Sequence, residues 1–425
     1  MNSTRDASDS KTPLDLLVRG ALVTPLGSEA LGGADLGRVF SLDRSAIAIQ
    51  DGVIVEVGPC DELESRYTAR ETLDAAGGLI VPGFVDCHTH PVFFGTREKE
   101  FELRTKGATY VEIAEAGGGI LSSVRGVREA AADALVERLV TRLDRFLALG
   151  TTTLEAKSGY GLSLEAELKS LEVLQRASSH PVELVTTFLG AHDVPPEYRG
   201  ERAKYVDLLV EEMLPAVRDA ELAEFCDIFT ESHVFGIDDS RRIMTRAKDL
   251  GFSLRMHVDQ LSSLGGAELA AELGAKSADH LEFVSDRGID ALGEAGVVPV
   301  LCPVVPLFLR IDKEAPARRM IDRGLAPAIS TDYNPGSCYL QSLPEVASWA
   351  ALRYSMTAEE CLTAMTLNAA ASLGRGDRVG TLEAGKQADL VVLDVPNLAH
   401  LVYELGRSPV RQVVKRGKLV VGFAS

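Results

Sequence analysis

The sequence predicts an α/β protein: a (β/α)8 TIM barrel, with a small composite β-sandwich domain formed by the N- and C-terminal segments. Two observations favour the barrel. The middle of the chain alternates short apolar runs with longer helical patterns, as repeated βαβ units do, and it contains eight such runs. A third observation favours the sandwich, because both terminal segments consist of short β-branched runs separated by turn signals.

The terminal segments each contain a two-residue turn signal between alternating apolar runs. Asp51-Gly52 separates SAIAIQ from VIVEVG, and Arg416-Gly417 separates VRQVVK from KLVV. Each segment is too small to bury a core alone, so we expect the two to fold together. The expected division is 1–80 and 376–425 for the sandwich, with 1–12 as a flexible tail, and 81–375 for the barrel.

The eight apolar runs of the middle segment are the expected barrel strands. They are GFVD (83–86), TTTLE (151–155), VELVTTF (182–188), CDIF (226–229), FSLRMH (252–257), KSAD (276–279), VVPVL (297–301) and APAIS (326–330). The segment EAAADALVERLVTRLDRFLALG, which ends at Gly150, is strongly amphipathic with helical spacing, which predicts a helix leading into the second strand.

The charge balance excludes several classes of partner. Sixty-two acidic against 44 basic residues give a formal charge of −18, which repels nucleic acid and anionic membrane surfaces. An anionic substrate therefore needs a specific local cation. The six cysteines form no C-x-x-C pair, and the N-terminus lacks an apolar leader, so we expect a cytoplasmic protein. The longest apolar stretch, from Gly296, is too short and too rich in proline to span a bilayer.

Polar side chains at the ends of the expected strands indicate a metal site. His88 and His90 follow the first strand at a spacing of two and so project to the same side. His257, His280 and Asp332 each fall at the end of another expected strand. Because the carboxyl ends of TIM-barrel strands converge on one face, these groups should meet there.

Three imidazoles and one carboxylate leave a coordination position open for water, which is typical of a catalytic metal site. We therefore expect His88, His90, His257 and Asp332 to hold a metal ion. The alternative is that these histidines are satisfied structural residues of the barrel.

This pattern resembles the amidohydrolase superfamily: H-x-H after strand one, histidines after strands five and six, and aspartate after strand eight. The resemblance covers nearly the whole chain, including GTLEAGKQADLVVLD from Gly380, which is similar to the superfamily's return to its sandwich. It implies one divalent or trivalent metal ion, zinc or iron.

Longer stretches resemble one family within it, the imidazolonepropionases. They are GTREKEFELRTKGATYVEIAEAGGGI from residue 95, EAKSGYGL from 155, TFLGAH from 187 and STDYNPGS from 330. The resemblance implies that the substrate is contacted by Arg97, Tyr160, His192, Gln260, Asn334, Gly336 and Ser337. The alternatives are that Arg97 forms a surface ion pair, that Tyr160 is a packed aromatic residue and that His192 caps a helix.

The chain departs from that family at three places. Thr230 and His233 stand where the family usually has cysteine and glycine, and 301–310 lacks the small residues expected after strand seven. Gln260 stands where glutamate can occur; an amide orients a substrate by hydrogen bonds but cannot act as a base.

The resemblance implies hydrolysis of the cyclic amide of 4-imidazolone-5-propanoate to N-formimidoyl-L-glutamate, in histidine degradation, by a homodimer. Asp332, His280 and Gln260 are the expected catalytic residues: Asp332 moves the proton, His280 polarises the carbonyl or stabilises the oxyanion, and Gln260 orients the ring. A heterocyclic-base deaminase, or another cyclic-amide hydrolase, would use the same metal ligands. A barrel that binds metal without catalysis is the alternative from another class.

Overall fold

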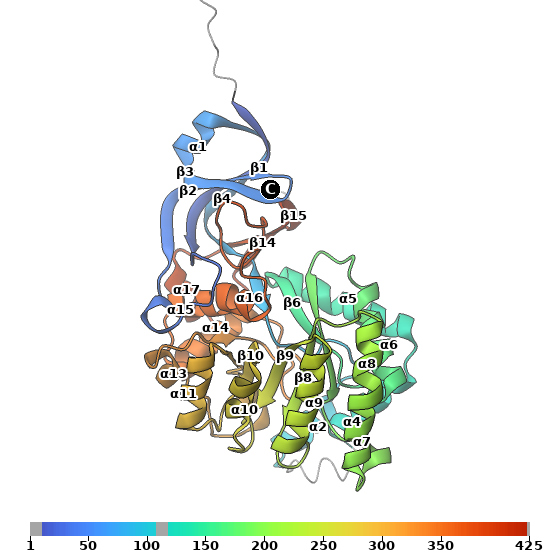
Figure 1. Cartoon of the computed structure of the whole chain (residues 1–425). Helices are drawn as coiled ribbons and strands as arrows, with labels where there is room; N and C mark the ends of the chain where they lie inside the picture. Colours follow the sequence, from blue (N-terminus) through green and yellow to red (C-terminus); the bar gives the residue numbers. More distant parts are fainter. Residues whose placement is uncertain (1–10, 108–117, 423–425) are drawn as a thin grey trace, which may run out of the picture.

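The computed structural model describes residues 11–107 and 118–422 and contains the expected barrel (Figure 1). Its parallel sheet has eight strands in the order β12-β11-β10-β9-β8-β7-β6-β5. Their bounds are β5 (Phe84–Asp86), β6 (Thr151–Lys157), β7 (Glu183–Ala191), β8 (Phe225–Thr230), β9 (Ser253–Val258), β10 (Ser277–His280), β11 (Val298–Leu301) and β12 (Ala328–Ile329). Each of the eight predicted runs therefore forms a strand.

The first and last strands approach each other and nearly close the barrel. Just beyond them, Thr89 and Tyr333 form a parallel bridge. The Ser330 hydroxyl donates to the backbone oxygen of His88 at 3.0 Å, and the Thr331 hydroxyl donates to the Asp86 carboxylate at 2.6 Å. These contacts join the segment that carries His88 to the segment that carries Asp332.

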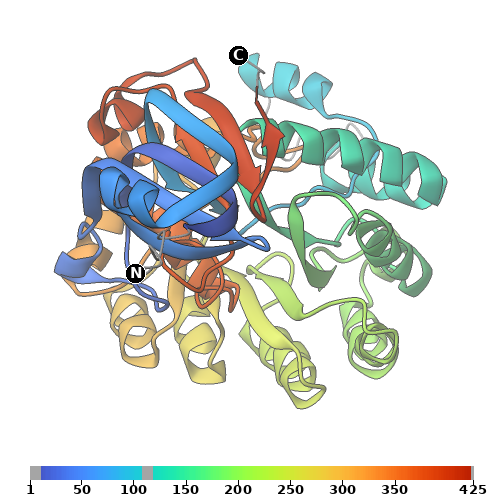
Figure 2. The same ribbon diagram turned by 90° about the horizontal axis from the view of Figure 1, so that it is seen from above.

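Helices surround the barrel, as Figure 2 shows from above. After the short α2 (Glu98–Thr105) and α4 (Ile120–Glu129), the helices are α5 (Ala132–Ala148), α6 (Leu164–Arg176), α7 (Arg202–Leu208), α8 (Leu214–Asp219), α9 (Ile237–Asp249), α10 (Gly266–Leu273), α11 (Asp286–Ala295), α12 (Val305–Leu309), α13 (Ala317–Asp322), α14 (Leu343–Tyr354), α15 (Ala358–Thr363) and α16 (Ala369–Ser372). In α5, the predicted amphipathic helix, Leu135, Leu139 and Leu143 are buried at a spacing of one turn.

The two ends of the chain share one seven-stranded sheet, ordered β15-β14-β13-β4-β1-β2-β3. Its strands are β1 (Thr12–Thr24), β2 (Phe40–Gln50), β3 (Val53–Pro59), β4 (Tyr67–Pro82), β13 (Leu390–Leu393), β14 (Val410–Lys415) and β15 (Lys418–Val421), and the helices α1 (Cys60–Arg66) and α17 (Leu398–Tyr403) lie between them in sequence. Both predicted turns have positive φ at both residues: 52° and 76° at Asp51-Gly52, and 49° and 72° at Arg416-Gly417.

The core of this sheet is built jointly, as the small size of each segment predicted. Leu16 and Ile47 from the N-terminal segment share one buried cluster with Leu390 and Val414 from the C-terminal segment. Residues 1–10 of the expected tail lie outside the described residues. No helix in the described ranges is both long and apolar enough to cross a bilayer.

Candidate metal centre and substrate cavity

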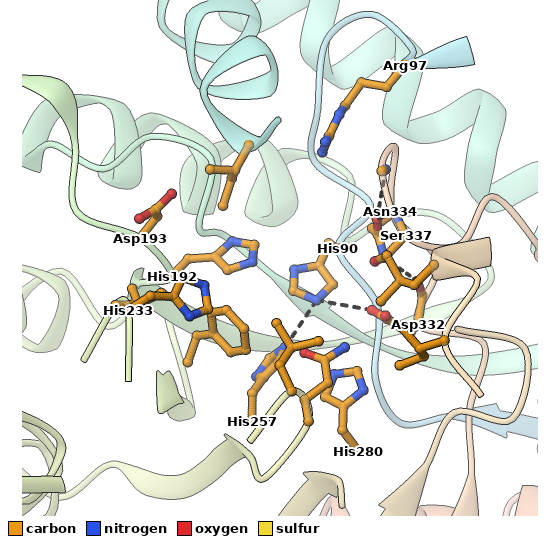
Figure 3. Close-up of a pocket in the computed structure, with 18 of the residues that line it drawn as sticks. His90, Arg97, His192, Asp193, His233, His257, His280, Asp332, Asn334 and Ser337 are labelled. Carbon is orange, nitrogen blue, oxygen red and sulfur yellow. Dashed lines mark hydrogen bonds and ion pairs between the residues drawn. The ribbon is translucent and has the colours of Figure 1, made fainter. Parts of the chain in front are cut away.

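The predicted metal donors converge at the carboxyl end of the barrel strands, and Figure 3 shows three of them, His90, His257 and Asp332. The Asp332 Oδ1 atom lies 3.5 Å from His88 Nε2 and 3.3 Å from His90 Nε2, and His90 Nε2 lies 3.4 Å from His257 Nε2. A tetrahedral zinc ion with ligand distances of about 2.0–2.1 Å separates its ligand atoms by roughly 3.3 Å. These three donor–donor distances have the spacing that one metal ion requires, and the donor atoms of His88, His90 and His257 all lie within 4.8 Å of one another.

Carboxylates behind the cluster orient two of the histidines. His88 Nδ1 lies 2.6 Å from Asp279 Oδ2, and His257 Nδ1 lies 3.1 Å from Asp227 Oδ1. Because a carboxylate accepts, each Nδ1 carries the proton and each Nε2 presents its lone pair to the cluster. Burial lowers the pKa of His257 to about 4 and that of His88 well below its ordinary value, so both rings are neutral, as metal ligands must be.

The donor set fits a cation because its lone pairs otherwise face one another. Among the described residues, His88 Nε2 and Asp332 Oδ1 are buried and have no hydrogen-bond partner. Buried polar atoms without partners are rare in folded proteins, and a bound ion is one reason for them. His280 completes a second group of potential ligands with His88 and Asp332, whose donor atoms all lie within 4.8 Å of one another.

The backbone is strained where these groups leave their strands. His280 has φ of 81°, Leu281 has 70° and Asp332 has 48°. Residues other than glycine rarely adopt this region of positive φ. Such conformations cost on the order of 1–3 kcal/mol each and cluster at functional sites. Here the strain turns the last residue of β10 and the residues after β12 inward.

A cavity of about 830 Å³ opens over the donors and collects the remaining predicted residues. His90, His257, His280 and Asp332 line its floor, and His88 is not in contact with it. The residues assigned to substrate contact all line its walls: Arg97, Tyr160, His192, Gln260, Asn334, Gly336 and Ser337. The structure thus brings together at one site residues from six segments of the chain.

Arg97 makes an ion pair, but in the cavity wall and not on the surface. Its Nε and Nη2 atoms donate to Glu100 Oε2 at 2.9 and 2.7 Å, and both side chains are only 10% exposed. Its Nη1 atom lies beside Gly336, where an added Cβ would stand 2.1 Å from it. Glycine at 336 therefore leaves the space that the guanidinium occupies.

His192 and Tyr160 form the aromatic side of the cavity. The His192 Nδ1–H donates to the backbone oxygen of Gly159 at 3.0 Å, so the ring caps no helix. Its ring stacks on His90 with centroids 5.0 Å apart, and Tyr160 packs against it at 5.2 Å. Burial lowers the pKa of His192 to about 3, so the ring is neutral and its Nε2 is free to accept a hydrogen bond from a substrate.

Asn334 shapes the loop after β12. Its amide nitrogen donates to the Asp332 backbone oxygen and to Ser337 Oγ, both at 2.7 Å. Its amide oxygen accepts from the backbone N–H groups of Gly336 and Ser337 at 2.8 and 2.7 Å. These bonds hold the loop in the form that places Asp332 and Gly336 at the cavity.

The structure shows where the residues lie at which the sequence departs from the family pattern. His233 lines the cavity beside Asp193, with its ring 6.1 Å from Phe229, whereas the Thr230 hydroxyl donates to Ser240 Oγ and is buried away from it. In segment 301–310, α12 forms part of the wall. Part of the long motif after residue 95, residues 108–117, lies outside the described residues.

Sequence reasoning missed the charged residues behind the metal donors. Glu155, Lys157, Asp227, Arg255 and Asp279 are fully buried inside the barrel strands. The available signal was their position: each is a charged residue within an otherwise apolar strand, and such residues are almost never fully buried unless paired.

Fold and site together define a metal-dependent hydrolase built on a TIM barrel. The model of the amidohydrolase family matches residues 79–420. Imidazolonepropionase from Symbiobacterium thermophilum is 50% identical over 416 residues, covering 96% of this chain and 98% of that protein. The enzyme from Geobacillus kaustophilus is 47% identical, with 95% of each chain covered. The chain therefore belongs to the amidohydrolase family and, within it, to the imidazolonepropionases.

The same architecture occurs in solved structures of distant sequence. The 5-methylcytosine deaminase from Klebsiella pneumoniae, liganded with 5-fluorocytosine, superimposes with a TM-score of 0.74 at 16% identity, covering 96% of this chain and 98% of that one. At this identity the likeness concerns the fold alone.

Proposed function

We propose that this chain hydrolyses the cyclic amide bond of 4-imidazolone-5-propanoate to give N-formimidoyl-L-glutamate, a step of histidine degradation. One observation carries the proposal: a single cavity is lined by three of the four proposed metal donors, His90, His257 and Asp332, and by Arg97. In this proposal the donors hold the metal ion that acts at the reacting carbonyl, and the guanidinium pairs with the propionate carboxylate. The names and the full-length similarity of the imidazolonepropionase relatives support the same substrate.

We assign His88, His90, His257 and Asp332 as the ligands of one zinc or iron ion. When bound, such an ion lowers the pKa of a coordinated water from ~15.7 to about 7 and so supplies hydroxide at neutral pH. Asp332 is the proton acceptor in this proposal, and it later delivers the proton to the leaving ring nitrogen. Burial raises the pKa of its carboxyl in the metal-free protein.

His280 and Gln260 act on the ring in this proposal. Burial lowers the pKa of His280 to about 3, so it meets the substrate as a neutral imidazole that can donate one N–H to the developing oxyanion. Gln260 lines the cavity three positions after His257 and can orient the ring through its amide. Because Gln260 has no basic group, proton transfer is left to Asp332.

Arg97 is the proposed partner of the propionate. In a chain with a formal charge of −18, a carboxylate substrate needs such a local cation. Tyr160, His192, Asn334, Gly336 and Ser337 complete the proposed contacts around it, Asn334 mainly by holding the loop. We also propose that the protein is a homodimer and that it is cytoplasmic. The location is supported by the six cysteines, which all lie in the described ranges and are free, in keeping with a reducing compartment.

The decisive experiment is to incubate the purified protein with 4-imidazolone-5-propanoate and follow loss of the ring chromophore, release of ammonia and metal content. Ring opening without ammonia, in proportion to bound metal, is the expected result. Ammonia release would favour a deaminase. Full metal content without turnover of any cyclic amide would favour a barrel that binds metal without catalysis.

A further inference from the structure

A buried charge network lies directly behind the metal donors. Lys157, at the end of β6, is fully buried, as are its two carboxylate partners. Its Nζ atom lies 2.9 Å from Glu155 Oε1 and 2.8 Å from Asp227 Oδ2. Removing such charges from water costs several kcal/mol per ion before their mutual attraction is counted. Apolar side chains would fill the barrel core without this cost, so the network calls for a specific role.

Each of the two carboxylates that pair with Lys157 uses its other oxygen to hold part of the metal centre. Asp227 Oδ1 accepts from His257 Nδ1 at 3.1 Å. Glu155 Oε2 accepts from the backbone N–H of Thr89 at 3.0 Å, and Thr89 is the residue between His88 and His90. The ammonium group thus connects the strand that carries one histidine ligand to the backbone that carries two others.

We propose that Lys157 is a positioning residue of the metal centre. Its ammonium group holds Asp227 and Glu155 in the orientations that keep His257 in register with His88 and His90. Without it, two buried carboxylates lie near each other with no cation hydrogen-bonded to both, and repulsion turns Asp227 away from the His257 ring. The inference rests on the metal site of the proposed function and requires nothing of the substrate.

Arg255 has a related place behind His88 but offers a less specific test. Its guanidinium donates to Asp279 Oδ2 at 3.4 Å, and also to the backbone oxygens of Cys87 and Ser372 at 2.7 and 3.2 Å. Replacing it would therefore disturb the barrel backbone directly. Both hydrogen bonds of the Lys157 ammonium go to the carboxylates that hold the donors.

The test is a titration of metal-free, full-length protein with Co²⁺, followed by visible absorption, which reports both affinity and coordination geometry. Lys157→Met keeps the length of the side chain and removes the charge. We expect Co²⁺ binding to weaken by roughly 10- to 100-fold, the usual effect of losing an outer-shell partner, with an altered spectrum.

The matched control is Lys415→Met. Lys415 pairs with Asp389 at 2.7 Å in the terminal sheet, and the two side chains are 3% and 2% exposed. Its loss also breaks a buried ion pair and should lower the melting temperature. Because the pair touches no metal donor, the Co²⁺ affinity and spectrum of this variant should match those of the parent.

A Lys157→Met variant that binds Co²⁺ within about threefold of the parent, with the parent spectrum, would overturn the inference. If that variant does not fold, Lys157→Met/Glu155→Gln leaves one fewer unpaired carboxylate; weak binding by it supports the inference, and parent-like binding overturns it. A parent protein that binds no Co²⁺ refutes the metal site itself, which distinguishes the two failures.

Discussion

Replacing Arg97 by methionine tests the recognition of the substrate carboxylate. The guanidinium already uses Nε and Nη2 for Glu100, which leaves Nη1 as the nitrogen with no hydrogen bond to a described residue. One hydrogen bond to a charged group is worth about 1.5–3 kcal/mol. We therefore expect kcat/KM for imidazolone propanoate to fall by roughly 10- to 150-fold.

The assay compares two substrates, imidazolone propanoate and an analogue that lacks the propionate. The analogue never pairs with the guanidinium, so its kcat/KM should change little, and the two losses together form a double-mutant cycle across the contact. Arg97→Met also leaves Glu100 without its partner near the site of the incoming carboxylate. The variant Arg97→Met/Glu100→Gln removes that repulsion and isolates the lost hydrogen bond.

Equal losses for both substrates would refute the assignment. Arg97 would then be a structural ion pair that supports the loop, and the main residue-level reason for a propionate-bearing substrate would be lost. Arg97→Met breaks the buried pair with Glu100 and should lower the melting temperature. General destabilisation affects both substrates alike, whereas a specific role lowers kcat/KM for the propionate substrate alone.

Chelation should abolish turnover, and His257→Ala should lose most of its metal but remain folded, because the barrel core provides most of the burial. Metal analysis, a thermal melt and a turnover assay check these outcomes. Near-stoichiometric metal with retained turnover would show that the ligands are misassigned. Asp332→Asn, compared on metal-saturated protein, should lose far more turnover than metal affinity, since an amide cannot accept a proton; the parent rate in that variant would exclude the proton transfer. Gly336→Ala places a Cβ 2.1 Å from Arg97 Nη1, so KM should rise for the propionate substrate and not for the analogue, and a parent-like KM would show that the guanidinium moves freely.

The sequence by itself determined the architecture and where the candidate metal donors lie, because both depend on local patterns. Eight apolar runs separated by helical periodicity predict barrel strands, and a histidine or aspartate at the end of such a run must lie on the catalytic face, since parallel strands end together. The turns at Asp51-Gly52 and Arg416-Gly417 were also readable, because positive φ favours Asp-Gly at the first turn and glycine at the second position of both.

The tertiary structure decided what each side chain contacts. No spacing rule places Glu155 and Asp227 on either side of Lys157, or Gly336 against Arg97, because these partners meet only after strands far apart in sequence have packed side by side. The same holds for Asn334, which lines the cavity and makes four hydrogen bonds within its own loop that support Asp332. Long-range packing sets these pairings, and with them the orientation of the metal donors.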